Sequence, residues 1–411
     1  MADPDTIAGS GRALRSGDRT ALDLVEQVFR RADRLDPTLG VFLARFADEA
    51  KVAAQALDEA LRAGRDHGPL HGVPLGIKDI IRTREGPTTA QSVVSLGDWG
   101  RATDAPVVSR LREAGAIVVG KVTLAEFAMG VPDPAKPFPV PRNPWDPRTW
   151  TGGSSSGTAG GIAAGLFPGG LGTDTGGSIR LPAAMCGVTG LRPTYGRVPV
   201  SGCLPMAPGL DTIGPMARTA EDCGLLFDAL VGSTGGTAAV PDLSGLRVGV
   251  ADLWAESDQV HPDQPELFTA AVRALARAGA TTVDVELPLY GRVCEASLVI
   301  QQVEALAFHR TALAERAADY AEASRLYLAG AAAYGAADYQ RARRVQRAGR
   351  RRVQRLFAEF DVIITPTTTT PAPLLATLDP CHLPGSAGCF HTRYWSVLGL
   401  PALSVPIGFT G

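Results

Sequence analysis

Apolar and polar residues follow two different patterns along this chain, one with the spacing of a helix and one of short apolar runs. Residues 20–65 carry apolar side chains every three to four positions, and Thr20 stands where a helix cap is expected, so this region is predicted to be mainly helical. The run 72–79 (GVPLGIKD) is short and apolar and ends in two charges, which predicts a buried strand. Residues 104–115 fit a helix and residues 116–119 a second buried strand. This order predicts parallel strands with helices packed on the faces of the sheet.

The second half of the chain repeats the alternation after an irregular stretch. Residues 131–150 are rich in proline, and glycine and serine dominate from there to about residue 196. Further elements are expected in the order strand, helix, strand, long helical region, strand and strand, over residues 246–251, 264–278, 281–287, 296–358, 361–365 and 402–407. No stretch is long enough to be a linker between domains. We therefore predict one large α/β domain.

Composition narrows the class of protein. The 411 residues carry 40 Lys and Arg against 42 Asp and Glu, and a net charge of −2 gives no field that would attract nucleic acid or an anionic membrane. No apolar stretch reaches the roughly 18–20 residues that a membrane-spanning helix needs, and the N-terminus lacks the features of a secretory signal. The six cysteines form no C-x-x-C pair, which favours reduced thiols in a cytoplasmic protein over a disulfide framework or a zinc site.

Two clusters rich in glycine and serine carry the chemistry. The first is 151–157 (TGGSSSG) and the second is 172–180 (GTDTGGSIR). Glycines before a serine allow several successive backbone N–H groups to point into one concavity, where they can stabilise a developing oxyanion. We expect Ser178 to be the nucleophile. The oxyanion hole is then expected to use the backbone N–H groups of the same loop, those of Thr175, Gly176, Gly177 and Ser178.

A serine nucleophile needs a base, and none of the six histidines (67, 71, 261, 309, 382 and 391) stands in a recognisable catalytic context. A lysine can serve instead if burial lowers its pKa enough to give the neutral amine. Lys78 is the candidate because it follows the apolar run 73–77, so that its stem begins in the core. Lys121 is the only other lysine at such a strand end.

These motifs resemble those of the amidase signature family, and the resemblance extends from about residue 20 to the end of the chain. It rests on GVPLGIKD, on the paired serines of TGGSSSG, on GTDTGGSIR, and on three later motifs at 187–194, 214–218 and 361–367. The resemblance implies the amidase signature fold over residues 1–411, with a central mixed, mostly parallel sheet covered by helices on both faces. Helices in 20–65 would precede a catalytic core of about 70–230 and a helical, pocket-lining region of about 255–395.

The resemblance also implies a Ser–Ser–Lys triad of Lys78, Ser154 and Ser178, in which Ser154 follows a cis peptide bond. Neutral Lys78 would take a proton from Ser154, and Ser154 one from Ser178, which attacks the amide carbonyl; water then hydrolyses the acyl-enzyme. The expected supporting residues of the two loops are Ser155, Asp174 and Arg180. No metal or organic cofactor is implied. The expected partner is a small amide substrate, and a homodimer is common at this size.

Three other interpretations remain open from the sequence. Residues 153–157 also match the G-x-S-x-G nucleophile elbow, which would make Ser155 the nucleophile of an α/β-hydrolase esterase, although the proline-rich residues 141–147 make a poor preceding strand. The eight arginines of 341–355 fit the solvated face of a helix, with no nucleic acid expected, or a contact to tRNA in a glutamine-hydrolysing component of an amidotransferase. A catalytically weak scaffold is the third alternative, because the chain stops at Gly411, short of the usual family length.

The sequence departs from the family pattern at a few positions. Ser156 replaces a glycine, which favours a small polar substrate. His391-Thr392 and Ser396 replace the Phe-Thr and Asn of the family. Residues 375–394, with two cysteines and two histidines, match no pattern that we can assign, and we expect them to line the acyl pocket. Their spacing fits no metal motif, so no zinc site is predicted.

Overall fold

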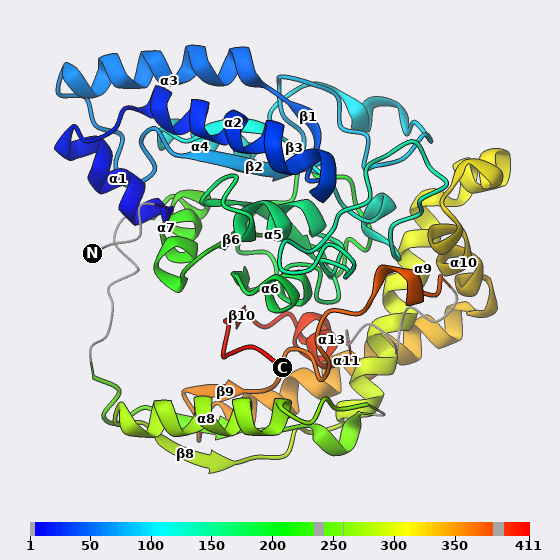
Figure 1. Ribbon diagram of the computed structural model, residues 1–411. Helices are drawn as coiled ribbons and strands as arrows, with labels where there is room; N and C mark the ends of the chain where they lie inside the picture. Colours follow the sequence, from blue (N-terminus) through cyan, green and yellow to red (C-terminus); the bar gives the residue numbers. More distant parts are fainter. Residues whose placement is uncertain (1–4, 234–241, 258, 381–389) are drawn as a thin grey trace.

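The computed structural model describes residues 5–233, 242–257, 259–380 and 390–411 (Figure 1). Within them, seven strands form a central sheet in the spatial order β1-β3-β2-β4-β6-β5-β10. Their bounds in that order are Phe42–Arg45, Ile117–Val122, Pro74–Lys78, Gly169–Asp174, Thr212–Ala217, Thr189–Arg192 and Ala402–Ser404. A second, smaller sheet has the order β8-β7-β9, with the bounds Thr281–Asp284, Arg247–Val250 and Val362–Ile364.

Helices cover both sheets. Those that accompany the central sheet in sequence are α1 (Ile7–Ser16), α2 (Ala21–Leu39), α3 (Ala47–Arg62), α4 (Pro106–Glu113), α5 (Ser156–Ala163), α6 (Arg180–Cys186) and α7 (Ala220–Val231). The later ones are α8 (Gln264–Arg277), α9 (Tyr290–Arg316), α10 (Glu322–Gly330), α11 (Ala336–Leu356) and α13 (Phe390–Leu398). The helical region expected over 20–65 is therefore α2 and α3 with the short strand β1 between them, and that expected over 296–358 contains α10, α11 and most of α9.

The central sheet separates two apolar cores, and the side chains of β3 alternate between them. Val118 packs into the core on the side of α4 and α7, whereas Ile117 and Val119 pack into the core shared with α2, α3 and α5. Successive side chains of a strand point to opposite faces, so a strand that is apolar at every position must be covered on both sides. The expected helices on both faces of the sheet are confirmed.

The predicted mixed sheet is confirmed; among the described residues two of its six strand pairs are parallel, both formed by β2, and four are antiparallel. Strand β2 pairs in parallel with β3 and β4, while β1, β6, β5 and β10 join through antiparallel pairs. The register places Ile77 opposite Leu171. Because parallel strands end at the same edge of a sheet, Lys78 at the end of β2 lies beside Thr173 and Asp174 at the end of β4.

The predicted strand–helix–strand unit of 246–287 is present, but it does not extend the central sheet. β7, α8 and β8 form it, and β9 joins β7 from the other side, so that both pairings in this small sheet are parallel. A third core gathers residues of α9, α11 and α13 next to this sheet (Figure 1). The packing of α13 against α9 matters for the site described below, because α13 reaches from this third core to the end of β4.

The part of the chain that the structure describes contains no helix both long and apolar enough to cross a membrane.

Candidate active site

Lys78 lies at the centre of a buried cluster of hydroxyl groups. Its side chain is fully buried, and Nζ lies 2.7 Å from Ser154 Oγ, 2.7 Å from Thr173 Oγ1 and 3.1 Å from Ser155 Oγ. No carboxylate within the described residues forms an ion pair with it. Strand β2 supplies the lysine, strand β4 supplies the threonine, and the loop that leads into α5 supplies the serines. The structure thus brings Lys78 and Ser154 together, as the sequence predicted.

These three contacts suit a neutral amine. A neutral amine has two N–H groups to donate and one lone pair to accept a proton, and an ammonium has three N–H donors; three hydroxyl partners fit either form, and burial favours the neutral one. The Ser155 hydroxyl donates to the Thr173 carbonyl at 3.2 Å, so its oxygen is available as an acceptor for Lys78. Burial lowers the pKa of Lys78 to about 7, against weaker opposing effects of Cys203, Asp174 and Asp211. Burial therefore favours the neutral form of this amine far more than solvent would for an exposed lysine.

Lys121, on the adjacent strand β3, is a second buried lysine with which Lys78 can be compared. It is as deeply buried as Lys78, but its Nζ pairs with Asp79 Oδ1 at 2.6 Å and donates to Thr88 Oγ1 at 2.8 Å. Burial lowers the pKa of Lys121 as well, but the Asp79 carboxylate opposes this and pairs with the amine, so Lys121 is less suited than Lys78 to accept a proton. The comparison supports Lys78 as the base.

Ser154 and Ser178 come from two loops that are joined through their backbones. The Gly153–Ser154 peptide bond is cis, as the resemblance implied, and the Ser155 N–H donates to the Ser178 carbonyl at 3.1 Å. Ser178 is the more accessible of the two serines. Within the described residues no hydrogen bond joins the Ser154 and Ser178 hydroxyls, so the structure contains the first link of the expected relay and not the second. Catalytic hydrogen bonds are often long without substrate and tighten in its presence.

The loop after β4 presents backbone N–H groups beside Ser178. Those of Thr175, Gly176 and Ser178 donate to no protein group in the part of the chain that is described. The Gly177 N–H differs, because it donates to Asp174 Oδ1 at 2.9 Å. The expectation that Gly177 contributes to the oxyanion hole therefore does not fit this structure, in which the carboxylate has already taken that donor.

Asp174 anchors this loop from beneath. Its carboxylate is fully buried and also accepts from the Ile179 N–H (3.3 Å), from Arg180 Nε (2.9 Å) and from Arg192 Nη1 (3.2 Å). Burial by itself would raise the pKa of Asp174, but the two guanidinium groups hold that pKa well below its ordinary value. Asp174 and Arg180 thus form the loop-supporting pair that the sequence predicted.

Helix α13 contributes residues that the sequence did not assign. Ser396 Oγ accepts from Arg180 Nη2 at 2.6 Å, and Thr392 Oγ1 donates to the Gly176 carbonyl at 2.7 Å. From β5, Arg192 reaches the carbonyls of Leu210 (2.9 Å) and Ser396 (3.1 Å). The sequence signals were the departure from the family pattern at 391–396 and, for Arg192, the motif at 187–194, and neither shows what these side chains contact.

Thr173 was also missed, although it belongs to the GTDTGGSIR motif. We expect Thr173→Val to lower kcat/KM about tenfold, because Lys78 loses one hydroxyl acceptor and is less firmly oriented toward Ser154. Thr173→Ser keeps an oxygen at this position and should restore most of the activity. Rates of amide hydrolysis at pH 8 for the two variants provide the measurement. Wild-type activity in Thr173→Val would show that this hydroxyl has no role in orienting the base.

The structure decides against Ser155 as the nucleophile of an α/β-hydrolase. Ser155 is fully buried, its hydroxyl donates to a backbone carbonyl, and none of the five described histidines contacts it. Of the segment expected to line the acyl pocket, residues 381–389 lie outside the described residues, and with them both cysteines of the zinc interpretation. His391 contacts Tyr290 Oη and Ser257 Oγ. Among the described residues, no three metal-ligating side chains gather at one place.

The arginine-rich segment 341–355 lies on a helix whose arginines mostly face solvent, as predicted from the sequence. Helix α11 buries Ala342, Gln346, Gly349 and Val353 against its neighbours and exposes most of its arginines. The absence of a nucleic-acid partner stays a prediction.

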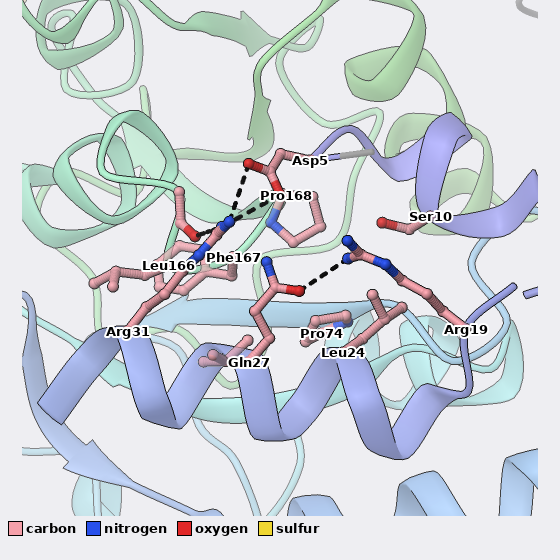
Figure 2. Close-up of a pocket in the computed structure, with 12 residues that line it drawn as sticks. Asp5, Ser10, Arg19, Leu24, Gln27, Arg31, Pro74, Leu166, Phe167 and Pro168 are labelled. Atoms are coloured by element: carbon pink, nitrogen blue, oxygen red, sulfur yellow. Dashed lines mark hydrogen bonds and ion pairs between the residues drawn. The ribbon is translucent and has the colours of Figure 1, made fainter. Parts of the chain in front are cut away.

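Figure 2 shows a pocket at the opposite edge of the central sheet. Pro74 and Pro168 line it, so it lies at the amino ends of β2 and β4, and an Arg31–Asp5 ion pair occupies one side of it. Lys78 stands at the other end of β2, so this pocket does not open onto the catalytic cluster. A smaller cavity, which Thr173 and Thr175 help to line, lies beside the cluster.

The comparisons with known proteins define the class as an amidase-family enzyme that acts on C–N bonds. The model of the family described as Amidase matches residues 23–411, and the chain belongs to that family. The chain is 36% identical over 444 aligned residues to a subunit of the Glutamyl-tRNA(Gln) amidotransferase of Chloroflexus aurantiacus, with 98% of this chain and 90% of the relative covered. It is also similar to the solved peptide amidase of Stenotrophomonas maltophilia (30% identity, TM-score 0.80, 98% of this chain and 90% of that chain). A crystal structure described as amidase has a TM-score of 0.87 at 32% identity, covering 97% and 92%.

Proposed function

We propose that this protein hydrolyses a carboxamide bond through an acyl-enzyme on Ser178, with Lys78 as the base and Ser154 as the proton relay. One observation carries the proposal. Lys78 is fully buried, is paired with no carboxylate among the described residues, and lies 2.7 Å from Ser154 Oγ. An amine in this state can accept a proton from a hydroxyl, whereas a lysine held in an ion pair cannot. Membership of the Amidase family supports the same chemistry.

The reaction begins when Ser178 Oγ attacks the amide carbonyl carbon. The Ser178 proton passes to Ser154 Oγ, and the Ser154 proton passes to Lys78 Nζ. Backbone N–H groups of Thr175, Gly176 and Ser178 would stabilise the negative charge on the carbonyl oxygen. The C–N bond breaks as the proton returns through Ser154 to the leaving nitrogen, which departs as ammonia or an amine. Water then attacks the acyl-enzyme along the same proton path and releases the carboxylic acid.

The test is ammonia release from a small panel: an aliphatic primary amide, an aryl amide, a ureido compound and glutamine. We expect at least one member to be hydrolysed by the wild-type protein and none by Ser178→Ala, which removes the nucleophile. Ammonia release by Ser178→Ala at the wild-type rate would contradict the proposal.

Activity should depend on the protonation state of Lys78. Because burial lowers the pKa of Lys78 to about 7, and only the neutral amine accepts a proton, kcat/KM should rise about tenfold per pH unit below 7 and level off above it. The kinetic profile between pH 5 and 9 provides the measurement. A rate that stays constant from pH 5 upward would show that another group acts as the base.

A second candidate function is glutamine hydrolysis as one component of a tRNA-dependent amidotransferase. The observation in its favour is the 36% identity, over 98% of this chain, to a relative whose name assigns it to such an enzyme. Glutamine hydrolysis that becomes rapid only when partner subunits of that enzyme class and glutamyl-tRNA are added would support this function. Rapid hydrolysis of another amide by the chain alone would support the independent amidase.

A further inference from the structure

One peptide unit in the loop before Ser178 is held from both sides. The carbonyl of Gly176 accepts a hydrogen bond from Thr392 Oγ1 at 2.7 Å, and the N–H of Gly177 donates to Asp174 Oδ1 at 2.9 Å. In a trans peptide these two groups point in opposite directions, so the two bonds clamp the plane between them. A rotation of this peptide would break both bonds at once.

We propose that Thr392 is a positioning residue that fixes the Gly176–Gly177 peptide and thereby determines which backbone N–H groups can face the oxyanion. This inference rests on the proposed function. With the peptide clamped, the N–H of Gly177 is turned toward Asp174. The N–H groups of Thr175, Gly176 and Ser178 remain available to the substrate.

The two residues that hold this peptide, Thr392 and Asp174, are themselves linked to each other, which restricts their movement. Arg180 Nη2 donates to the Thr392 carbonyl at 3.0 Å and to Asp174 Oδ1 at 3.0 Å, so one guanidinium bridges both partners of the peptide. Thr392 itself is buried, and Gln346 of α11 holds the far end of α13 by donating to the Val397 carbonyl at 2.7 Å. A hydroxyl on a helix held in this way has little freedom to release the loop.

Neighbouring side chains pack closely against both glycines of this peptide. Gly177 has φ +136°, a conformation that L side chains rarely adopt, and a Cβ there would overlap the Thr392 hydroxyl. On the other side, a Cβ on Gly176 would lie 2.9 Å from Gln301 Oε1 of α9. The glycines of the motif therefore allow α9 and α13 to pack closely against the loop. The hydrogen bond from Thr392 to the Gly176 carbonyl then joins α13 to the loop in a fixed direction.

A fluorophosphonate tests this without knowledge of the substrate. Ser178 Oγ forms a bond to phosphorus, the P–F bond breaks and fluoride leaves, while the Ser178 proton passes toward Lys78; the phosphoryl oxygen takes the place of the oxyanion. For Thr392→Val we expect the second-order labelling rate at pH 9 to fall about 10- to 100-fold, below the loss for a whole oxyanion donor. The midpoint of the pH profile should not move, because Lys78 is untouched. Thr392→Ser should label at close to the wild-type rate.

The matched control is Thr189→Val, since Thr189 is another buried threonine whose hydroxyl donates to a carbonyl, that of Arg218, at the opposite edge of the sheet. It should label at the wild-type rate. Rates are expressed per folded molecule, with folding checked by thermal unfolding. Wild-type labelling of Thr392→Val, or an equal loss in Thr392→Ser or Thr189→Val, would overturn the role of the Thr392 hydroxyl. Labelling of Ser178→Ala at the wild-type rate would instead overturn the proposed function.

Discussion

Replacing Lys78 with methionine should lower kcat/KM at pH 8 by about 10³- to 10⁵-fold, somewhat less than the roughly 10⁶-fold loss that follows removal of the histidine base of a serine hydrolase. Methionine keeps the length and apolar stem of the side chain but cannot accept the proton of Ser154. The buried amine forms no ion pair in the described structure, so its removal should cost far less folding free energy than loss of a paired lysine would. Initial rates on whichever amide the panel identifies provide the measurement, with the melting temperature alongside.

Lys121→Met is the matched control, because it removes an equally buried lysine from the adjacent strand. It leaves Asp79 as a buried carboxylate without its counter-charge, so we expect the folded state to lose several kcal/mol, about 3–5, while the folded fraction keeps its activity. The two substitutions should therefore have different effects: Lys78→Met should lower the reaction rate, and Lys121→Met should lower the stability of the folded state. Activity within tenfold of wild type in Lys78→Met would contradict the assignment of the base.

Asp174→Asn should lower the free energy of unfolding by about 3–5 kcal/mol, because it leaves two buried guanidinium groups without their shared counter-charge. Arg180 is 3% exposed and Arg192 is fully buried, and burial lowers the pKa of Arg192 to about 10 even with the carboxylate in place. Asparagine keeps one acceptor oxygen but presents an NH2 donor to the groups that now donate to the other oxygen, so the predicted loss combines charge and hydrogen bonding. Urea denaturation at pH 7 provides the measurement.

Asp361→Asn is the corresponding control at the surface. Asp361 pairs with Arg247 at 3.0 Å, but both side chains are more than 40% exposed, and water can replace the lost partner. Its denaturation midpoint should stay within experimental error of wild type. A similarly small change in Asp174→Asn would mean that the buried cluster is not the anchor of the oxyanion loop.

The chemistry of the site could be predicted from the sequence because it is encoded locally. A lysine that follows an apolar run must start in the core, and a serine that follows two glycines can sit in a loop of exposed N–H groups. Both properties depend on neighbours in the chain. The same local reasoning found α8, α11, β2 and β7, whose apolar spacing is strong. It missed β1, β4, β5 and β6, which are short or rich in glycine and gain their pairing from neighbouring strands.

From the sequence came the class of fold, Lys78 as the proposed base and the loop that carries Ser178, and the family resemblance added Ser154 as the first partner of that base. Tertiary structure decided the rest: Thr173 reaches Lys78 only because β2 and β4 run in parallel, and Arg192, Thr392 and Ser396 reach Asp174 and its loop only because β5 and α13 pack around them. It also turned the Gly177 N–H away from the position expected for it. The physical reason is that a hydrogen bond depends on distance and direction in space, and no spacing along a chain specifies which groups more than 200 residues apart will meet.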